Sequence, residues 1–236
     1  MLRAASLAES RGVGGSMMET MLHDRPEHTP ERLIAASPIH GRTVQRLYFC
    51  GPHGAGKSTL VRWVSATYGV PMIHEVARGE LAKLETTLPA LRSDTERCTA
   101  YQLDVFRGQI AAERSIARPF VSDRACDNLC YLADSGDGVG SLWETEECRA
   151  YVESLRAPDA LVFLVLPHGG HVSADTARPA ADAERRAIDR IDGMAKLLLE
   201  IARIPYIPVG PMSVQERQRQ IAGCLRLAGW RKKETT

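Results

Sequence analysis

A glycine-rich loop at residues 51–58 constrains this chain more than any other feature of its sequence. The loop reads GPHGAGKS and fits the pattern G-x-x-x-x-G-K-[ST] at every fixed position. Its glycines permit a tight turn in which successive backbone N–H groups point at phosphate oxygens. In loops of this kind the lysine reaches the β- and γ-phosphates, and the serine hydroxyl binds Mg²⁺. The pattern therefore predicts ATP and Mg²⁺ as cofactors.

The chain on either side of the loop favours this interpretation over an ordinary glycine turn. An apolar strand, LYFC at 47–50, precedes the loop, and a helix at 59–68 follows it with Leu60, Val61 and Val64 on one face. The N-terminus of such a helix directs its positive end at a bound anion. We expect Lys57 to be catalytic as well and Ser58 to be a metal ligand. The predicted nucleotide-binding residues are Gly51, Pro52, His53, Gly54, Ala55, Gly56, Lys57, Ser58 and Thr59.

Strand-like and helix-like segments alternate along the rest of the chain. The run ALVFLVL at 160–166 is apolar throughout, as a central parallel strand covered on both faces requires. The alternation predicts a three-layer α/β fold with a parallel five-stranded sheet and helices on both faces. Expected strands are 47–50, 70–73, 120–122, 160–166 and 205–209. Expected helices are 59–68, 75–85, 94–118, 124–132, 143–155, 182–203 and 214–227, with polar loops at 134–141 and 168–179.

The two ends of the chain lack this alternation. Residues 1–44 mix glycines, prolines and small residues without an apolar period, which predicts a disordered extension. Met17, Met18 and Met21 are alternative candidates for the start of translation. We expect the folded domain to occupy 45–230 and a short tail to occupy 231–236.

Composition argues against several classes of protein. The formal net charge is +1, so no strong basic field favours nucleic acid. Six cysteines contain no Cys-x-x-Cys pair, which fits buried apolar thiols in a reducing cytoplasm better than a zinc site. No apolar run is long enough to span a membrane, and the N-terminus lacks a secretory signal. We therefore expect a cytoplasmic protein without a membrane partner.

Asp123 and Arg124 follow the expected strand 120–122. Ligands collect at the carboxyl ends of strands in open α/β sheets, and a carboxylate there can hold Mg²⁺. The planar guanidinium of Arg124 suits a phosphate or carboxylate of the substrate. The alternative is that Asp123 caps the next helix and Arg124 is solvated.

Glu75 follows the expected strand 70–73 and would face the same sheet edge as the glycine loop. It could accept a proton from an attacking hydroxyl as a general base. The alternative is a carboxylate that stabilises the start of a helix.

The polar loop at 168–179 and the helix after it carry arginines. Arg178 lies in the loop and Arg185 just inside the helix, where they could neutralise charge that develops on a transferred group. His168 and His171 lie in the same loop, but two histidines without a third ligand favour a flexible loop over a metal site.

With these residues in view, the chain resembles the AAA-domain ATPase/kinase family that includes the nicotinamide ribonucleoside kinase domain of bacterial NAD regulators. Four segments carry the resemblance: GPHGAGKSTL at 51–60, HEVARGEL at 74–81, SDRACDNLCYL at 122–132 and ARPAADAERRAIDRIDGMAKLL at 177–198. SDR and the later Tyr131 also look like thymidylate and deoxynucleoside kinases. The resemblance implies a kinase-like P-loop NTPase fold.

The resemblance also implies roles for individual residues. Glu75 or Asp123 would lie near the accepting hydroxyl or Mg²⁺. Glu75, Arg78, Arg124 and Arg185 would bind substrate, and Arg178 and Arg185 would belong to a lid.

We therefore expect a kinase that transfers the γ-phosphate of ATP to a nucleoside-, nucleotide- or similar hydroxyl-bearing small molecule. The alternative is a regulatory or binding ATPase without phosphotransfer. A guanine-specifying Asn/Thr-Lys-x-Asp motif and a Leu-Ser-Gly-Gly-Gln signature are both missing, which argues against GTPase switches and transporter ATPases. The oligomeric state stays open between monomer and homodimer.

Overall fold

Five parallel strands form one sheet whose spatial order differs from their order along the chain. The computed structural model describes residues 43–74, 76–84, 90–91, 93–168 and 181–234. The sheet runs β2-β3-β1-β4-β5, so β1 is central and its neighbours are strands that come much later in the sequence. The strands are β1 (Arg46–Cys50), β2 (Met72–Ile73), β3 (Phe120–Ser122), β4 (Ala160–Val165) and β5 (Tyr206–Val209).

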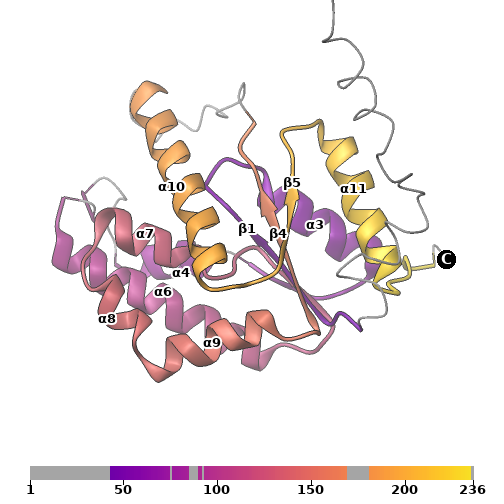
Figure 1. Cartoon of the computed structure of the whole chain (residues 1–236), viewed down its shortest axis with the longest axis horizontal. Coiled ribbons are helices and arrows are strands. Elements are labelled where there is room, and N and C mark those ends of the chain that lie inside the picture. Colours follow the sequence, from indigo (N-terminus) through magenta and orange to yellow (C-terminus); the bar gives the residue numbers. More distant parts are fainter. Residues whose placement is uncertain (1–42, 75, 85–89, 92, 169–180, 235–236) are drawn as a thin grey trace, which may run out of the picture. The chain divides into compact units, whose positions relative to one another are not determined.

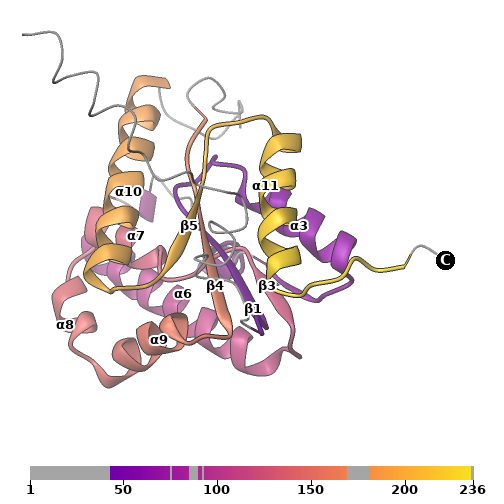
Figure 2. The ribbon, with the colours of Figure 1, turned by 45° about the vertical axis from the view of Figure 1, so that its right-hand side comes forward.

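Helices cover both faces of the sheet. One face carries α3 and α11, and the other carries α6, α7, α9 and α10, as Figures 1 and 2 show from two directions. The predicted three-layer α/β fold with a five-stranded parallel sheet is therefore confirmed. The helices are α3 (Lys57–Tyr68), α4 (Val76–Lys83), α6 (Thr95–Ser115), α7 (Asn128–Ser135), α8 (Val139–Trp143), α9 (Glu146–Arg156), α10 (Ala181–Ile201) and α11 (Val214–Leu227).

The centre of the core lies between β1 and β4. Every residue of both strands is buried, as the uninterrupted apolar run of β4 predicts. The strands pair in register from Arg46 opposite Ala160 to Cys50 opposite Leu164. Phe49 and Phe163 stack between them with ring centroids 5.2 Å apart. This packing fixes the end of β1, from which the glycine loop begins.

The region between α7 and α9 differs from the prediction. Residues 134–141 were expected as a loop and 143–155 as one helix, but α8 starts inside the former and ends at Trp143. A new helix begins at Glu146 because the Thr145 side chain accepts a hydrogen bond from the backbone N–H of Cys148. Leu142 of α8 is buried, which anchors this short helix to the core.

Long helix α6 ends at Ser115, three residues before the predicted limit at 118. The residue that precedes a proline is disfavoured in the α-helical conformation, and Pro119 follows Arg118. Ile116 is already extended, so the chain turns toward β3 sooner than apolar periodicity alone suggests.

The beginning and end of the described domain meet near α3. Trp230 donates its indole N–H to the Val44 carbonyl at 3.0 Å, and the backbone N–H of Lys233 donates to Thr67 at 2.9 Å. The extension predicted for 1–44 lies outside the described residues as far as residue 42. Among the helices described, none combines the length and apolar character needed to cross a membrane.

Candidate nucleotide-binding site

The glycine loop occupies the turn between β1 and α3, and two of its glycines are required by geometry. Gly51 has φ of +131°, and a Cβ there would lie 2.5 Å from the Val165 carbonyl oxygen of β4. Gly56 caps α3 with φ of 93° and a left-handed conformation. Only glycine adopts such backbone angles at this close approach without strain. The positions of the glycines in the motif therefore match what this turn requires. The turn joins β1 to α3 and passes close to β4.

Lys57 is the first residue of α3, and its side chain folds back over the loop. Its ammonium donates hydrogen bonds to the carbonyl oxygens of Gly51 at 2.7 Å and Pro52 at 2.9 Å. The side chain is buried, so the cation stays inside the loop rather than in solvent. This position is consistent with the predicted contact of Lys57 with phosphate oxygens, which stays a prediction.

Ser58 and Asp123 converge from α3 and from the end of β3. The Ser58 hydroxyl donates a hydrogen bond to Oδ2 of Asp123. Asp123 is 6% exposed, and its backbone N–H donates to the Ile73 carbonyl at 3.2 Å, which ties it to the end of β2. The predicted metal-binding pair, Ser58 and Asp123, is thus brought together where α3 begins and where β2 and β3 end.

Ser58 and Asp123 supply two oxygen donors, a number that suits Mg²⁺ better than a metal whose ligands all come from the protein. No cluster of three or more His, Cys, Asp or Glu side chains suited to a metal occurs within the described part of the chain. Mg²⁺ often takes one or two protein oxygens and completes its octahedron with waters and substrate phosphates. The donor set of Ser58 and Asp123 matches that mode.

Arg124 lies beside this pair in a mostly buried environment. Its guanidinium lies 5.2 Å from the centroid of the Tyr131 ring on α7 and 3.6 Å from a carboxylate oxygen of Asp127. The Tyr131 hydroxyl in turn accepts a hydrogen bond from the backbone N–H of His53 at 2.9 Å. Tyr131 therefore joins the glycine loop to the arginine predicted to bind substrate.

Sequence reasoning missed the part that Asp127 plays. This side chain is 1% exposed, pairs with Arg124 and accepts the backbone N–H of Ala125 at 2.9 Å. The spacing of Arg124 and Asp127 is the available signal, because a carboxylate three residues after an arginine can pair with it.

Four further residues were predicted for the site. Glu75 and Arg178 lie outside the described residues. Arg78 is exposed on α4, and Arg185 is exposed on α10.

Several cysteine thiols surround the site, and they are poor nucleophiles. Burial raises the pKa of the Cys130 thiol to about 12, with the nearby Asp127 carboxylate adding to the effect. Burial likewise raises the pKa values of Cys50 and Cys126. All six cysteines are free, and five of them are buried. They act as small apolar side chains, as predicted.

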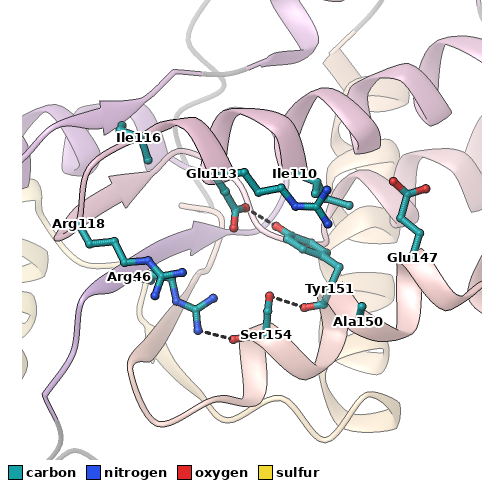
Figure 3. Close-up of a pocket in the computed structure, with 10 residues that line it drawn as sticks. Arg46, Ile110, Glu113, Ile116, Arg118, Glu147, Ala150, Tyr151 and Ser154 are labelled. Carbon is teal, nitrogen blue, oxygen red and sulfur yellow. Dashed lines mark hydrogen bonds between the residues drawn. The ribbon is translucent and has the colours of Figure 1, made fainter.

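A cavity of about 360 Å³ lies beside Arg46 at the amino end of β1, whereas the glycine loop follows the carboxyl end of this strand. Figure 3 shows the residues that line it. Arg46 donates to the Ser154 carbonyl and pairs with Asp159, which also pairs with Arg118. Glu113 accepts hydrogen bonds from the hydroxyl groups of Tyr48 and Tyr151. Because these charged side chains form ion pairs and hydrogen bonds with other groups of the protein, we assign the cavity a structural role.

The central β1, the glycine loop and Asp123, which directly follows the adjacent strand β3, define a kinase-like P-loop NTPase. Residues 46–217 match the AAA domain family, and the chain belongs to that family. The resemblance inferred from the sequence is thereby confirmed.

Solved structures show the same fold. A NadR protein in complex with NR superposes with a TM-score of 0.61 at 14% identity, over 82% of this chain and 53% of that one. A NadR protein with NAD and AMP-PNP gives a TM-score of 0.55 at 16% identity, over 82% and 52% of the two chains. The chain thus spans about half the length of NadR.

A deoxyadenosine kinase from M. mycoides, with products dCMP and dCDP bound, has a TM-score of 0.50 at 13% identity. The superposition covers 77% of this chain and 98% of the deoxyadenosine kinase chain. A search of curated proteins gives no match.

Proposed function

We propose that this protein is an ATP-dependent kinase that transfers the γ-phosphate of ATP to a hydroxyl of a nucleoside- or nucleotide-like small molecule. The observation that carries the proposal is the meeting of the P-loop, Asp123 and the buried Arg124 at one edge of the sheet. A P-loop alone serves many NTPases, whereas a buried guanidinium next to the metal-binding pair offers a second anionic group a place to bind.

The P-loop residues hold and polarise the nucleotide. The Lys57 ammonium, which donates to the loop carbonyls of Gly51 and Pro52, would donate to the β- and γ-phosphate oxygens when ATP binds. Ser58 and Asp123 would hold Mg²⁺, which would neutralise charge on the phosphates.

Arg124 anchors the acceptor. Its guanidinium is held in place by the Tyr131 ring and the Asp127 carboxylate, so its orientation is fixed before substrate arrives. The NadR complex with NR and the deoxyadenosine kinase complex support an acceptor of the nucleoside or nucleotide class.

Glu75 is the general base of the proposal. In the sequence it comes two residues after Ile73, the last residue of β2, whose carbonyl accepts a hydrogen bond from the backbone N–H of Asp123. Since Asp123 is engaged by Ser58 and suited to Mg²⁺, Glu75 remains to take the proton of the attacking hydroxyl.

Three further arginines are assigned roles in substrate binding and transfer. Arg78 contributes to the substrate side, while Arg178 and Arg185 stabilise charge that develops during transfer and help to exclude water.

The test measures transfer from γ-labelled ATP across a panel of nucleosides, nucleotides and other hydroxyl-bearing small molecules, beside phosphate release without acceptor. A kinase releases little phosphate alone and labels one class of acceptor, because water is excluded until the site closes. Lys57→Ala is the inactive control. Fast release without any labelled product would contradict the kinase proposal and favour a regulatory ATPase.

A further inference from the structure

Arg217 reaches the P-loop from a distant part of the chain. It lies in the first turn of α11, and its side chain points at the P-loop turn, 162 positions earlier in the sequence. Its Nη1 donates to the Ala55 carbonyl at 2.6 Å, and its Nη2 donates to the Leu166 carbonyl at 3.1 Å. The residue is 4% exposed, so the guanidinium is enclosed between α11, the P-loop and the end of β4.

The charge of Arg217 has no carboxylate partner within ion-pair distance among the described residues. In this it differs from the other buried arginines, since Arg46 pairs with Asp159 and Arg124 with Asp127. Nε of Arg217 also has no hydrogen-bond partner within the described part of the chain. Burial lowers the pKa of Arg217 from its usual 12.5. An enclosed cation without a counter-ion is costly for folding, so stability alone is a weak reason for an arginine at this position.

The contact with Ala55 sets the direction of the next backbone N–H. The carbonyl of Ala55 and the N–H of Gly56 belong to one peptide group, and in a trans peptide they point in opposite directions. Because Arg217 holds the carbonyl toward α11, the Gly56 N–H is directed away from α11 and toward the phosphate-binding side. Gly56 also lies against the guanidinium, since a Cβ on it would be 3.5 Å from Nη1.

We propose that Arg217 is a positioning residue of the nucleotide site, and that the counter-ion of its buried charge is the polyphosphate of the bound nucleotide. It fixes the Ala55–Gly56 peptide in the orientation that binds phosphate, and it adds a positive charge directly behind the loop. The proposal depends on nucleotide binding and is independent of whether phosphate is transferred.

Two substitutions separate the charge from the hydrogen bond. Arg217→Gln keeps a donor for the Ala55 carbonyl but removes the charge, and Arg217→Lys keeps the charge but loses the two-pronged contact. Arg219→Gln is the matched control, because Arg219 lies exposed on the same helix.

The experiment is titration calorimetry of the full chain with Mg²⁺ and each of adenosine, AMP, ADP and ATP, with melting temperatures measured in parallel. We expect Arg217→Gln to weaken ATP binding about 10-fold or more, since hydrogen bonds and contacts of charged groups contribute at that level. The loss should shrink from ATP to AMP, vanish for adenosine, and decrease at high salt. Arg217→Lys should recover part of the ATP affinity.

A purely structural role predicts a different pattern. It would lower the melting temperature and weaken adenosine, AMP and ATP binding by the same factor in both variants. That pattern, or an ATP affinity unchanged in Arg217→Gln, would overturn the proposal. If the Gln variant fails to fold, Arg217→Lys decides by the same comparison of adenosine with ATP. Absence of phosphate transfer to every acceptor would leave this result intact and count only against the kinase.

Discussion

Lys57 illustrates how a single residue can be buried without belonging to the apolar core. Its ammonium donates hydrogen bonds to carbonyl oxygens of the P-loop itself, at 2.7 and 2.9 Å. The ammonium therefore lies against the loop, where it would meet a bound phosphate, and we expect its side chain to contribute little to the packing of the strands. Effects on binding and on stability should therefore separate at this position.

Lys57→Ala is expected to abolish measurable ATP·Mg²⁺ affinity while the fold persists. Removing a charged donor from a phosphate site costs about 1.5–3 kcal/mol for each hydrogen bond lost. Calorimetry gives the affinity and thermal denaturation gives the stability. Lys196→Ala is the control, because Lys196 pairs with Asp192 on α10. Wild-type ATP affinity in Lys57→Ala would rule out the P-loop assignment.

Asp123 and Glu75 should respond differently to loss of charge. Asp123→Asn keeps an oxygen for the Ser58 hydroxyl but weakens the bond to Mg²⁺, so activity should require higher Mg²⁺ concentrations. Glu75→Gln should lower transfer by about 100-fold or more, as expected for loss of a general base, with ATP affinity retained. A Mg²⁺ titration of transfer rates beside ATP titrations checks both. Equal loss of ATP affinity in the two variants would argue against separate roles.

At the scale of the element, Thr145 separates α8 from α9. Its hydroxyl accepts the backbone N–H of Cys148 and so caps α9. Thr145→Ala should destabilise the protein by about 1 kcal/mol, the usual loss for an N-cap, without changing ATP affinity. Thr145→Ser keeps the hydroxyl and should recover most of the stability. Denaturant unfolding measures both, and a Ser variant as unstable as the Ala variant would show that the cap is not the cause.

The elements that the sequence predicts best are those whose signal is local. The apolar run of β4 and the glycine spacing at Gly51 and Gly56 each reflect geometry within a few residues, and the structure has them as expected. Helix α8 was missed because a five-residue helix around Leu142 has too few turns for an apolar period. Arg217 was missed for a different reason: its partner Ala55 lies 162 positions away, and nothing in α11 marks one arginine among several as buried.

At the scale of the whole molecule, Glu113 links its own helix, α6, to β1 and α9. It accepts hydrogen bonds from Tyr48 of β1 at 2.6 Å and from Tyr151 of α9 at 2.7 Å. Burial raises the pKa of Glu113 above its usual 4.5, while hydrogen bonds from Tyr151, Tyr48 and Gln109 act in the opposite direction. The folded state therefore binds the proton of this carboxyl more tightly than the unfolded state does.

The sign of the resulting pH dependence follows from linkage. With the pKa raised on folding, the contribution of Glu113 to stability is fully present below 4.5 and is lost as pH rises through the folded pKa. The stability of the wild type relative to Glu113→Gln should therefore fall as pH rises above 4.5. Chemical denaturation at a series of pH values measures this difference, and Glu96→Gln on the exposed first turn of α6 is the charge-matched control. A relative stability that rises over this window would contradict the assignment.

Trp230 joins the two ends of the described domain, and its removal tests where the domain stops. Its indole N–H donates to Val44, and its ring lies edge-on to Tyr68 of α3 at 5.7 Å. Trp230→Ala should destabilise by about 1–3 kcal/mol, less than the ~3–5 kcal/mol of a fully buried aromatic, because the side chain is half-buried. Trp230→Phe keeps an aromatic ring and should lose only the hydrogen bond.

A chain that begins at residue 43 keeps Val44 and should retain the melting temperature and ATP affinity of the full chain. A large loss of either in that truncated chain would show that residues 1–42 contribute to the folded domain, and the proposed boundary would have to move toward the N-terminus.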